Sequence, residues 1–304
     1  MSRVTYEPGR IEDSEQLCRI FFQAVGDLAR RKGFSTKTVE ENLREAEEEW
    51  PSLRPMFEHL ANTGEQFWLA KEDGEVIGYA RGIMRDGVRE LTEFFVLPDK
   101  QSAGVGRELL ARAFPRADAA HRVIVATIDT RALARYLKAG VYPRTPIYNF
   151  SREPRPLQVS TALEITPLTG SAEEMAVLND LDWAVLGYTR EVDHRFWQQT
   201  RSGFIARRRG AASAAVGYGY SGYDGGPFAL LDPADFPALL CHAEALAAQA
   251  HKRFHVEVPL VNRAAVDYLL GQGYEMGPFL TLLLSDEPFG RMENYILPAP
   301  PFTL

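Results

Sequence analysis

The segment VLPDKQSAGVG, residues 96–106, is the feature that most restricts how this chain folds and what it binds. It follows an apolar stretch typical of a strand, carries glycines at 104 and 106, and precedes a stretch with helical spacing, RELLARAF. A strand, a glycine loop and a helix start gather backbone N–H groups at one point, and the helix dipole adds partial positive charge there. Glycine lets a ligand approach the backbone, so the segment favours a phosphate or diphosphate. A tight turn without a ligand is the alternative.

The residues before this segment predict two helical regions. Apolar residues recur at spacings of three and four over residues 11–32, which predicts an amphipathic helix. A second helical region begins near Ser35 or Thr36 and carries the acidic run EENLREAEEEW. We expect Pro51 and Pro55 to break this region and a further short helix, MFEHLAN, to follow.

Around the glycine segment the pattern alternates between strands and helices. Residues 66–98 have a period of two and predict three strands, joined by turns at EDGE and RDG. After the glycine segment come a helix that Pro115 should kink or end early, the apolar strand RVIVATID, and a helix that ends at Gly140. With strand residues in VYPRTPIYNFSR, the predicted order is β-α-α-β-β-β-α-β-α-β.

An internal repeat indicates that the fold is duplicated. DTRALARYLKAGV (129–141) and NRAAVDYLLGQGY (262–274) share Asp or Asn at the first position, Ala at the fourth and Gly at the twelfth. The stretch EPRPLQVS (153–160) holds two prolines and no periodicity, as a linker does. We therefore predict one domain at 1–152, the linker at 153–160, and a second domain at 161–304.

Composition and charge exclude several classes of function. The formal net charge of -7 argues against a general nucleic-acid binder, which needs a basic surface. No apolar run approaches the ~18 residues of a membrane span, and the charged N-terminus is unlike a signal peptide. We expect a cytoplasmic protein that binds neither nucleic acid nor membrane.

The metal-ligating and redox-active residue types give no site. Cys18 and Cys241 lie far apart in the sequence and are expected to be reduced core residues. The six histidines show no ligand spacing such as H-x-x-x-H with an acid, so no metal is expected.

Two motifs resemble one enzyme family. The arrangement V-x-P-x-x-Q-x-x-G-x-G (Val96, Pro98, Gln101, Gly104 and Gly106) resembles the pyrophosphate motif of the GNAT acyltransferase superfamily. The loop departs from the family at two positions, because an often aromatic residue is Lys100 and an often basic one is Ala103.

The second motif lies downstream at the distance usual in that family. The pattern N-x-x-A-x-x-x-Y-x-x-x-G-[FY] is matched by Asp129, Ala132, Tyr136 and Gly140. The resemblance covers essentially residues 1–150, and the second half looks like a degenerate copy. It implies an α/β (α+β) fold of two tandem GNAT-like domains. Each would be a mixed, mostly antiparallel twisted sheet, flanked by helices, with a splayed parallel strand pair.

The resemblance implies acetyl-CoA, or another acyl-CoA, as co-substrate. In this family the pantetheine runs between two splayed parallel strands and pairs with the first of them. The corresponding edges here are 93–97 and 123–128, and the diphosphate would meet the backbone amides of 101–107. The implied cofactor-binding residues are Phe95, Val96, Leu97, Gln101, Ser102, Ala103, Gly104, Val105, Gly106, Arg107, Asp129 and Ala132.

The resemblance also implies catalytic roles. Acyl transfer to an amine needs a base for the amine, donors for the oxyanion, and an acid for the leaving thiolate. Tyr136 stands where family members carry the tyrosine that protonates the sulfur, and a phenol suits that role because its pKa exceeds that of a thiol. The backbone near Val96 and Leu97 would supply the oxyanion donors.

The base remains open among three candidates. In a regular strand Glu93 alternates with apolar residues, and burial there would raise its pKa. Glu90 lies on the other face in such a strand and falls nearer the usual glutamate position of the family. The terminal carboxylate of Leu304 is the third candidate, since the chain end enters the active cleft in some tandem members.

The second half is not expected to bind coenzyme A. It has DPADFPALL where the first half has the glycine loop, and Pro237 removes a backbone donor. The resemblance implies an N-acetyltransferase that transfers an acetyl group to a primary amine, small-molecule or peptide, with a homodimer as a possible assembly. The alternatives are a non-catalytic acyl-CoA-binding regulator and a mycothiol-synthase-like tandem acyltransferase.

Overall fold

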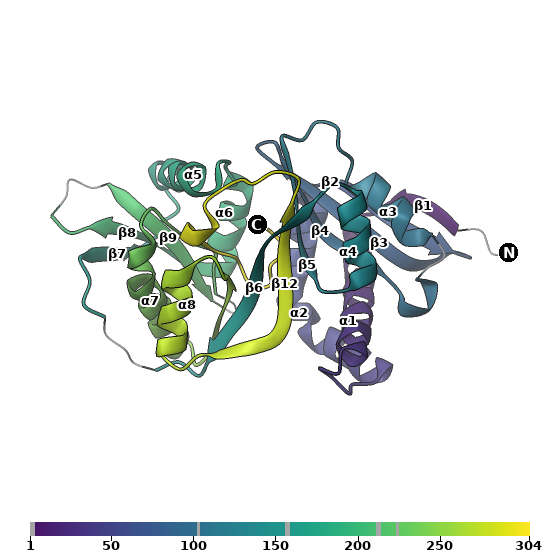
Figure 1. The fold of residues 1–304 in the computed structure, drawn as a ribbon, viewed down its shortest axis with the longest axis horizontal. Helices are drawn as coiled ribbons and strands as arrows, with labels where there is room; N and C mark the ends of the chain where they lie inside the picture. The colour runs from purple at the N-terminus through teal and green to yellow at the C-terminus, as the bar shows by residue number, and fades with distance from the viewer. Residues whose placement is uncertain (1–3, 102–103, 156–158, 211–213, 223–224) are drawn as a thin grey trace. The chain divides into compact units, whose positions relative to one another are not determined.

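The computed structural model describes residues 4–101, 104–155, 159–210, 214–222 and 225–304, and the chain divides into two compact units (Figure 1). Unit 1 comprises Met1–Ile124 and Asp129–Val141, and unit 2 comprises Val125–Ile128 and Tyr142–Leu304. Among the described residues, no helix is both long enough and apolar enough to cross a membrane.

Unit 1 is a mixed sheet with helices, in the predicted order of elements. Its strands follow one another in space as β1-β2-β3-β4-β5, and only the β4–β5 pairing is parallel. The elements are β1 (Val4–Pro8), η1 (Ile11–Asp13), α1 (Ser14–Arg31), α2 (Val39–Thr63), β2 (Gly64–Glu72), β3 (Glu75–Arg85), β4 (Val88–Val96), η2 (Pro98–Lys100), α3 (Val105–Ala113), β5 (His121–Thr127) and α4 (Thr130–Lys138).

The two predicted hairpin turns in this sheet are confirmed. Asp73 and Gly74 join β2 to β3, with φ of 51° and 92°, and Asp86 and Gly87 join β3 to β4, with φ of 43° and 85°. Two consecutive residues at positive φ give the turn whose twist matches that of the flanking strands, which is why Asp-Gly serves there.

The parallel pair β4–β5 stays together only at its beginning. Pairing runs from Val88 and His121 to Leu91 and Ile124 and stops there, whereas β4 continues to Val96. Within the described part of the chain, residues 93–96 keep β3 as their only strand neighbour. The splayed parallel pair predicted for the first half is therefore present.

Helix α2 corrects one prediction. It is continuous over 25 residues with Pro51 and Pro55 inside it, and it begins after a capping box formed by Thr38 and Glu41. Both prolines are exposed, so the carbonyl groups that lose their helical donors lie on the hydrated side of the helix. The predicted effect of Pro115 is confirmed, since α3 ends at Ala113.

Unit 2 contains two strand groups. One has the order β13-β10-β9-β8-β7 and the other β12-β6-β11, each antiparallel throughout. The elements are β6 (Tyr142–Arg152), β7 (Leu163–Pro167), α5 (Ala172–Leu186), α6 (Glu191–Thr200), β8 (Arg201–Arg208), β9 (Ala215–Gly222), β10 (Phe228–Leu230), η3 (Pro233–Asp235), α7 (Phe236–Gln249), β11 (Phe254–Pro259), α8 (Arg263–Gly271), β12 (Glu275–Ser285), η4 (Met292–Asn294) and β13 (Tyr295–Ile296).

Strand β6 places the division between units earlier than the predicted domain end at residue 152. It pairs with β11 on one side and β12 on the other, so it belongs to unit 2, and the division falls between Val141 and Tyr142. The domain limits 1–152 and 161–304, with the linker 153–160, stay predictions based on sequence.

The internal repeat has a structural counterpart. Asp129 caps α4 by accepting from the N–H of Arg131, and Asn262 caps α8 by accepting from the N–H of Ala265. Both helices follow a strand and are followed by a glycine in the left-handed region, at 140 and 273. The two halves thus repeat the same strand, cap, helix and glycine stop.

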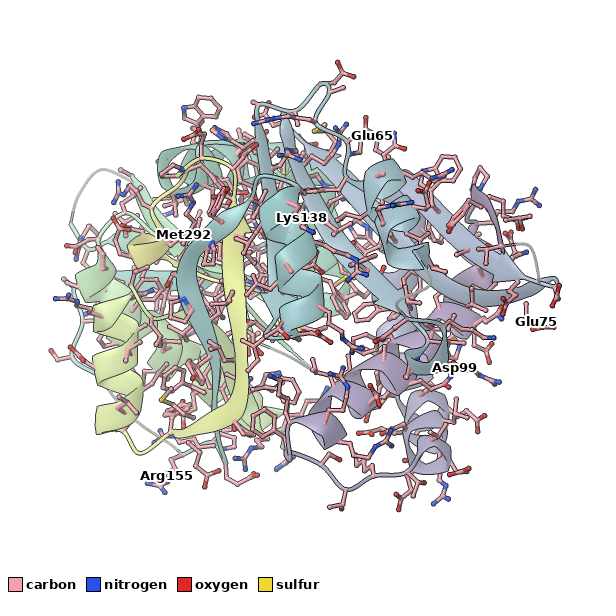
Figure 2. The ribbon with its side chains drawn as sticks, turned by 45° about the vertical axis from the view of Figure 1, so that its right-hand side comes forward. Glu65, Glu75, Asp99, Lys138, Arg155 and Met292 are labelled. Carbon is pink, nitrogen blue, oxygen red and sulfur yellow. The ribbon has the colours of Figure 1, made fainter. Side chains whose placement is uncertain are left out.

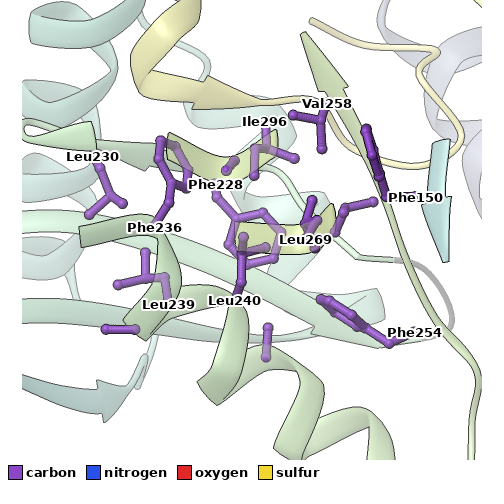
Figure 3. Packing of buried hydrophobic residues seen from close by; sticks show 14 of the residues in the cluster. Phe150, Phe228, Leu230, Phe236, Leu239, Leu240, Phe254, Val258, Leu269 and Ile296 are labelled. Atoms are coloured by element: carbon purple, nitrogen blue, oxygen red, sulfur yellow. The ribbon is translucent and has the colours of Figure 1, made fainter. Parts of the chain in front are cut away.

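The core of unit 2 is built around β10, α7 and α8 (Figure 3). Phe228, Phe236, Leu240, Leu269 and Ile296 are all fully buried in one cluster. Ile296 belongs to β13, so the C-terminal segment is part of this core.

A buried polar network holds the same C-terminal segment. Asp182 accepts from Nε of Arg190 and from Nε2 of His194, both at 2.9 Å, and the Arg190 guanidinium also donates to the hydroxyls of Tyr218 and Tyr295 at 2.7 Å each. Burial acts to raise the pKa of Asp182, but the charge of Arg190 and the His194 contact outweigh it and hold that pKa below its usual range.

Candidate active site

The glycine loop lies between β4 and α3 and contains one position that requires glycine. Gly104 caps α3 with φ of +87°, a backbone conformation that L residues rarely adopt, and beyond its chain neighbours no atom of the described residues lies within 4 Å of the position where its Cβ would stand. The predicted residues Ser102 and Ala103 lie outside the described part of the chain. The space beside Gly104 is therefore open to a ligand.

Gly106 has no side chain for a different reason. A Cβ there would stand 3.1 Å from Cζ of Phe94 and 3.7 Å from Nε of Arg135. Glycine at this position lets the Phe94 ring and the Arg135 guanidinium pack against the first turn of α3.

Gln101 braces the loop from its start. Its Nε2 donates to the carbonyl of Val96, the last residue of β4, at 3.0 Å. The N–H of Leu97 donates to the carbonyl of Ile77 at 2.9 Å. Of the two predicted oxyanion donors, the Leu97 amide therefore already has an acceptor.

The first turn of α3 offers backbone donors and a cation. The amides of Arg107 and Glu108 both donate to the carbonyl of Gly104, whereas the amides of Val105 and Gly106 precede the first possible helical acceptor. The Arg107 side chain is 80% exposed. An anion at this point meets N–H groups, the helix dipole and a guanidinium.

A β-bulge at Thr92 corrects the predicted placement of the two glutamates. Glu90 pairs with Ile83 and Glu93 pairs with Arg81, so β4 has one residue more than β3 between these pairs. Cross-strand partners share a face, and alternate residues of β3 also share one, so Glu90 and Glu93 project to the same face of the sheet. The expectation of opposite faces assumed a regular strand and was wrong.

The two faces of β4 carry different neighbours. Phe95, on the face of Glu93, packs against Phe21 of α1 with ring centroids 5.1 Å apart. Phe94 turns to the other face, where it contacts the α3 position at Gly106 and the ring of Tyr136 on α4, 6.1 Å away. The carboxylates thus lie on the α1 side of β4 and the phenol on the α3 side.

Glu93 has one hydrogen bond, at Oε1, and one ion pair, at Oε2, where it makes no hydrogen bond. Oε1 accepts from the hydroxyl of Tyr79 at 2.8 Å, and Oε2 lies 3.0 Å from Nη1 of Arg81. Burial raises the pKa of Glu93, as predicted, and the charge of Arg81 and the Tyr79 hydrogen bond oppose that rise. Glu90 is also buried, 4% exposed.

Tyr136 is buried with a hydroxyl that no protein group satisfies. Its residue exposure is 5%, and the hydroxyl makes no hydrogen bond with any residue in the described ranges. Burial raises the pKa of Tyr136, the negative charge of Asp129 adds to that rise, and Arg135 opposes it. The phenol is thus held in its protonated form.

Asp129, which was predicted to bind the cofactor, has protein partners of its own. Its carboxylate caps α4 through the N–H of Arg131 and forms an ion pair with Arg31 of α1 at 2.9 Å. Burial acts to raise the pKa of Asp129, but the hydrogen bonds from Arg131 and Arg31 hold it below the usual range. Ala132, one turn into α4, is partly exposed.

A cavity of about 270 Å³ lies in unit 1 next to the start of the loop. It is lined by residues of α1, α2 and η2, namely Gln23, Asp27, Arg30, Val39, Asn42, Pro98 and Asp99. No periodic pattern in the sequence indicates this cavity, because its lining residues come from three separate elements.

The sequence of this region matches a family of enzymes. Residues 34–141 match the Acetyltransferase (GNAT) family. This part of the chain is thus similar to a GNAT acetyltransferase domain. The matched range contains the splayed pair, the glycine loop and Tyr136.

Solved structures extend the likeness in fold to the whole chain. The structure is similar to a putative acetyltransferase from Pyrococcus horikoshii, with 14% identity, a TM-score of 0.72, and coverage of 96% of this chain and 92% of that chain. It is also similar to a tandem GNAT protein from the clavulanic acid biosynthesis pathway, with 13% identity, a TM-score of 0.59, and coverage of 94% and 99%. A third similar structure is a GCN5-related N-acetyltransferase from Sphaerobacter thermophilus, with 14% identity, a TM-score of 0.56, and coverage of 96% of this chain and 98% of that chain. No curated protein matches this sequence significantly.

In unit 2, the strands that correspond to the splayed GNAT pair are bridged by the chain itself. Strand β13 pairs antiparallel with β10 through Phe228 and Ile296, and the N–H of the next residue, Leu297, donates to the carbonyl of Glu257 on β11 at 3.0 Å. Since the segment 295–297 is antiparallel to both neighbours, β10 and β11 run parallel with this segment between them. Sequence reasoning missed β13, because two residues carry no periodicity.

Unit 2 also lacks the glycine loop of the GNAT domain. Helix α7 begins at Phe236 with Pro237 in its first turn, and Asp235 stands directly before it, paired with Arg208 at 2.7 Å. A carboxylate at this helix start disfavours a phosphate, because two negative charges would meet.

Two further predictions concern the terminal carboxylate of Leu304 and a metal site. The backbone oxygen of Leu304 accepts from the hydroxyl of Tyr188 at 2.7 Å, and Leu304 is buried, so one oxygen at the chain end has a partner within unit 2. No group of His, Cys, Asp and Glu residues that could hold a metal occurs among the described residues.

Proposed function

We propose that unit 1 is an N-acyltransferase that moves an acetyl group from acetyl-CoA to a primary amine by direct attack. The observation that carries this proposal is the Tyr136 side chain, which is 5% exposed and lies on the face of β4 that leads to the glycine loop, with a hydroxyl that makes no hydrogen bond to any described residue. A ligand that reaches this hydroxyl would supply its partner.

The cofactor would be held by backbone more than by side chains. The amides at the start of α3 and the open side of Gly104 suit the diphosphate, and the edge of β4 at 93–96 suits the amide-bearing pantetheine arm. Acetyl-CoA brings the thioester, whose carbonyl carbon is the electrophile.

The chemical step needs one proton to leave the amine and one to reach the sulfur. The amine nitrogen attacks the thioester carbonyl, the C–N bond forms, and the C–S bond breaks when the tetrahedral intermediate collapses. Tyr136 donates its proton to the departing thiolate, and the backbone N–H of Val96 stabilises the oxyanion.

Glu90 is the base that we assign. Glu93 accepts a hydrogen bond from Tyr79 and forms an ion pair with Arg81, both inside the protein, so we assign Glu93 to hold the bulge in β4. Glu90 projects to the same face and precedes the bulge. An amine that arrives from the α1 side would meet Glu90, while the sulfur meets Tyr136 from the opposite face.

A non-catalytic acyl-CoA-binding regulator is the second candidate. The engagement of Glu93 favours it, because that residue was the first candidate for the base. A mycothiol-synthase-like activity is less favoured, because the glycine loop is in the first half and the chain fills the corresponding slot of unit 2. The acceptor, a small-molecule or peptide amine, and a homodimer remain proposals.

Calorimetry and a thiol-release assay separate these candidates. We expect the full chain to bind acetyl-CoA and to release thiol with at least one member of a panel of primary amines. Gly104→Val should abolish binding. Gly74→Val is the matched control, since Gly74 also has positive φ and open space but lies in the β2–β3 turn. Binding without turnover on any amine would leave the regulator, and no binding by the wild-type chain would refute both.

A further inference from the structure

Arg135 of α4 reaches the start of α3. Its Nε lies 3.7 Å from the point where a Cβ on Gly106 would stand, so the guanidinium packs over the first helical turn. Its Nη1 donates to the carbonyl of Arg131, one turn earlier on the same helix, at 3.0 Å. This bond fixes the direction of the side chain and leaves further guanidinium N–H groups for another acceptor.

The other cations of α4 are placed differently. Arg131 is paired with Asp129, at 3.1 Å, so its charge is partly neutralised. Lys138 is the last residue of the helix, two turns from the N-terminal cap (Figure 2). The corresponding position in unit 2, 133 residues after Arg135, is Tyr268, and unit 2 has no glycine loop. Of these two equivalent positions, the one with a cationic side chain, Arg135, thus lies in the half of the chain that has the glycine loop.

We propose that Arg135 binds a phosphate of acyl-CoA at the first turn of α3. The loop itself has Ala103 at the position where a basic side chain would otherwise help. A guanidinium supplies planar donors that match phosphate oxygens, and here it adds to the backbone amides and the helix dipole. Gly106 lies at this contact between α3 and α4, since a Cβ there would stand in van der Waals contact with Nε of Arg135, at 3.7 Å.

This inference rests on the proposed function and adds a specific side chain to it. The ligand group is a phosphate ester, which in coenzyme A is either the diphosphate or the 3′-phosphate. Truncated cofactors distinguish the two sources: 3′-dephospho-CoA lacks only the second, and acetylpantetheine lacks both.

The test compares charge-removing variants of the full chain on α4. Arg135→Gln should raise the Kd for coenzyme A about tenfold, the loss typical of one charge-assisted bond. Lys138→Gln, with the same change of charge on the same helix, should leave it within about twofold, and Arg135→Lys should recover part of the loss. The wild-type preference for acetyl-CoA over acetylpantetheine, as kcat/KM, should shrink in Arg135→Gln with the rate on acetylpantetheine unchanged.

Three outcomes would overturn the inference. Equal Kd values for wild type and Arg135→Gln would show that Arg135 makes no phosphate contact. Equal losses in Arg135→Gln and Lys138→Gln would reduce the effect to net charge. If the wild-type chain binds no coenzyme A, the proposed function fails together with this inference, whereas the first two results leave the proposed function standing. A loss that persists with 3′-dephospho-CoA places the contact at the diphosphate, and one that disappears places it at the 3′-phosphate.

Discussion

The side-chain amide of Asn262 donates to the backbone carbonyl of Tyr295 at 3.2 Å, and both groups are buried. Asn262 stands in the repeat where Asp129 stands in unit 1, at the start of the helix that follows the second splayed strand. In unit 2 this position therefore contacts the chain's own C-terminal segment, which lies between β10 and β11.

The filled slot leads to a prediction about stoichiometry. We expect each chain to bind one coenzyme A, because in unit 2 residues 295–297 fill the slot between β10 and β11, and α7 is not preceded by a glycine loop. Isothermal calorimetry on the full chain measures the ratio directly. A ratio of two would contradict this assignment, and Gly104→Val tells which unit is occupied, since it should remove all binding if the site is in unit 1.

The fold could be predicted from sequence wherever one segment carried its own signal. Asp-Gly at positive φ specified the hairpins, Gly140 marked a helix end, and the repeat at an offset of 133 indicated the duplication. Each of these features depends on the backbone preferences of a few adjacent residues.

The features of the fold that could not be predicted depend on contacts between residues that are distant in the sequence. The bulge at Thr92 is an adjustment of β4 to β3, and it reversed the predicted faces of Glu90 and Glu93. The pairing of β13 with β10 joins segments more than 60 residues apart. Helix α2 continues through Pro51 because the groups left without partners are on the exposed side, which a propensity rule does not consider.

The role of Tyr136 gives the most direct kinetic prediction. Tyr136→Phe removes the proposed proton donor and keeps the ring that packs on Phe94, so turnover should fall by roughly ten- to a thousandfold with the Kd for coenzyme A unchanged. Steady-state kinetics with calorimetry checks both numbers. Unchanged turnover in Tyr136→Phe would remove Tyr136 as the acid.

The pH dependence follows from the same residue. In the proposed mechanism Tyr136 acts in its protonated form, and burial raises its pKa above the ordinary tyrosine value of about 10, so we expect the phenol to stay protonated throughout the neutral and mildly alkaline range. We therefore expect kcat not to decline between about pH 8 and pH 10. A pH–rate profile at saturating acetyl-CoA tests this. A decline in that interval that disappears in Tyr136→Phe would mean that the Tyr136 pKa is lowered, contrary to the buried environment.

The two buried glutamates should respond differently to the same substitution. Glu90→Gln removes the assigned base, and kcat/KM should fall by roughly 10²- to 10⁴-fold with little change in the melting temperature. Glu93→Gln leaves the fully buried Arg81 guanidinium without its counter-charge, and breaking such a pair costs about 3–5 kcal/mol of folding free energy.

Urea denaturation and kinetics on both variants decide between these roles. If Glu93→Gln keeps full stability and its turnover falls in the acidic limb of the pH–rate profile, Glu93 is the base. Tyr79 and Arg81 would then set its pKa. If Glu90→Gln retains full turnover, the base lies elsewhere, and the terminal carboxylate of Leu304 becomes the next candidate. A chain extended by one glycine after Leu304 then moves that carboxylate by one residue, and a loss of kcat with unchanged stability would identify it.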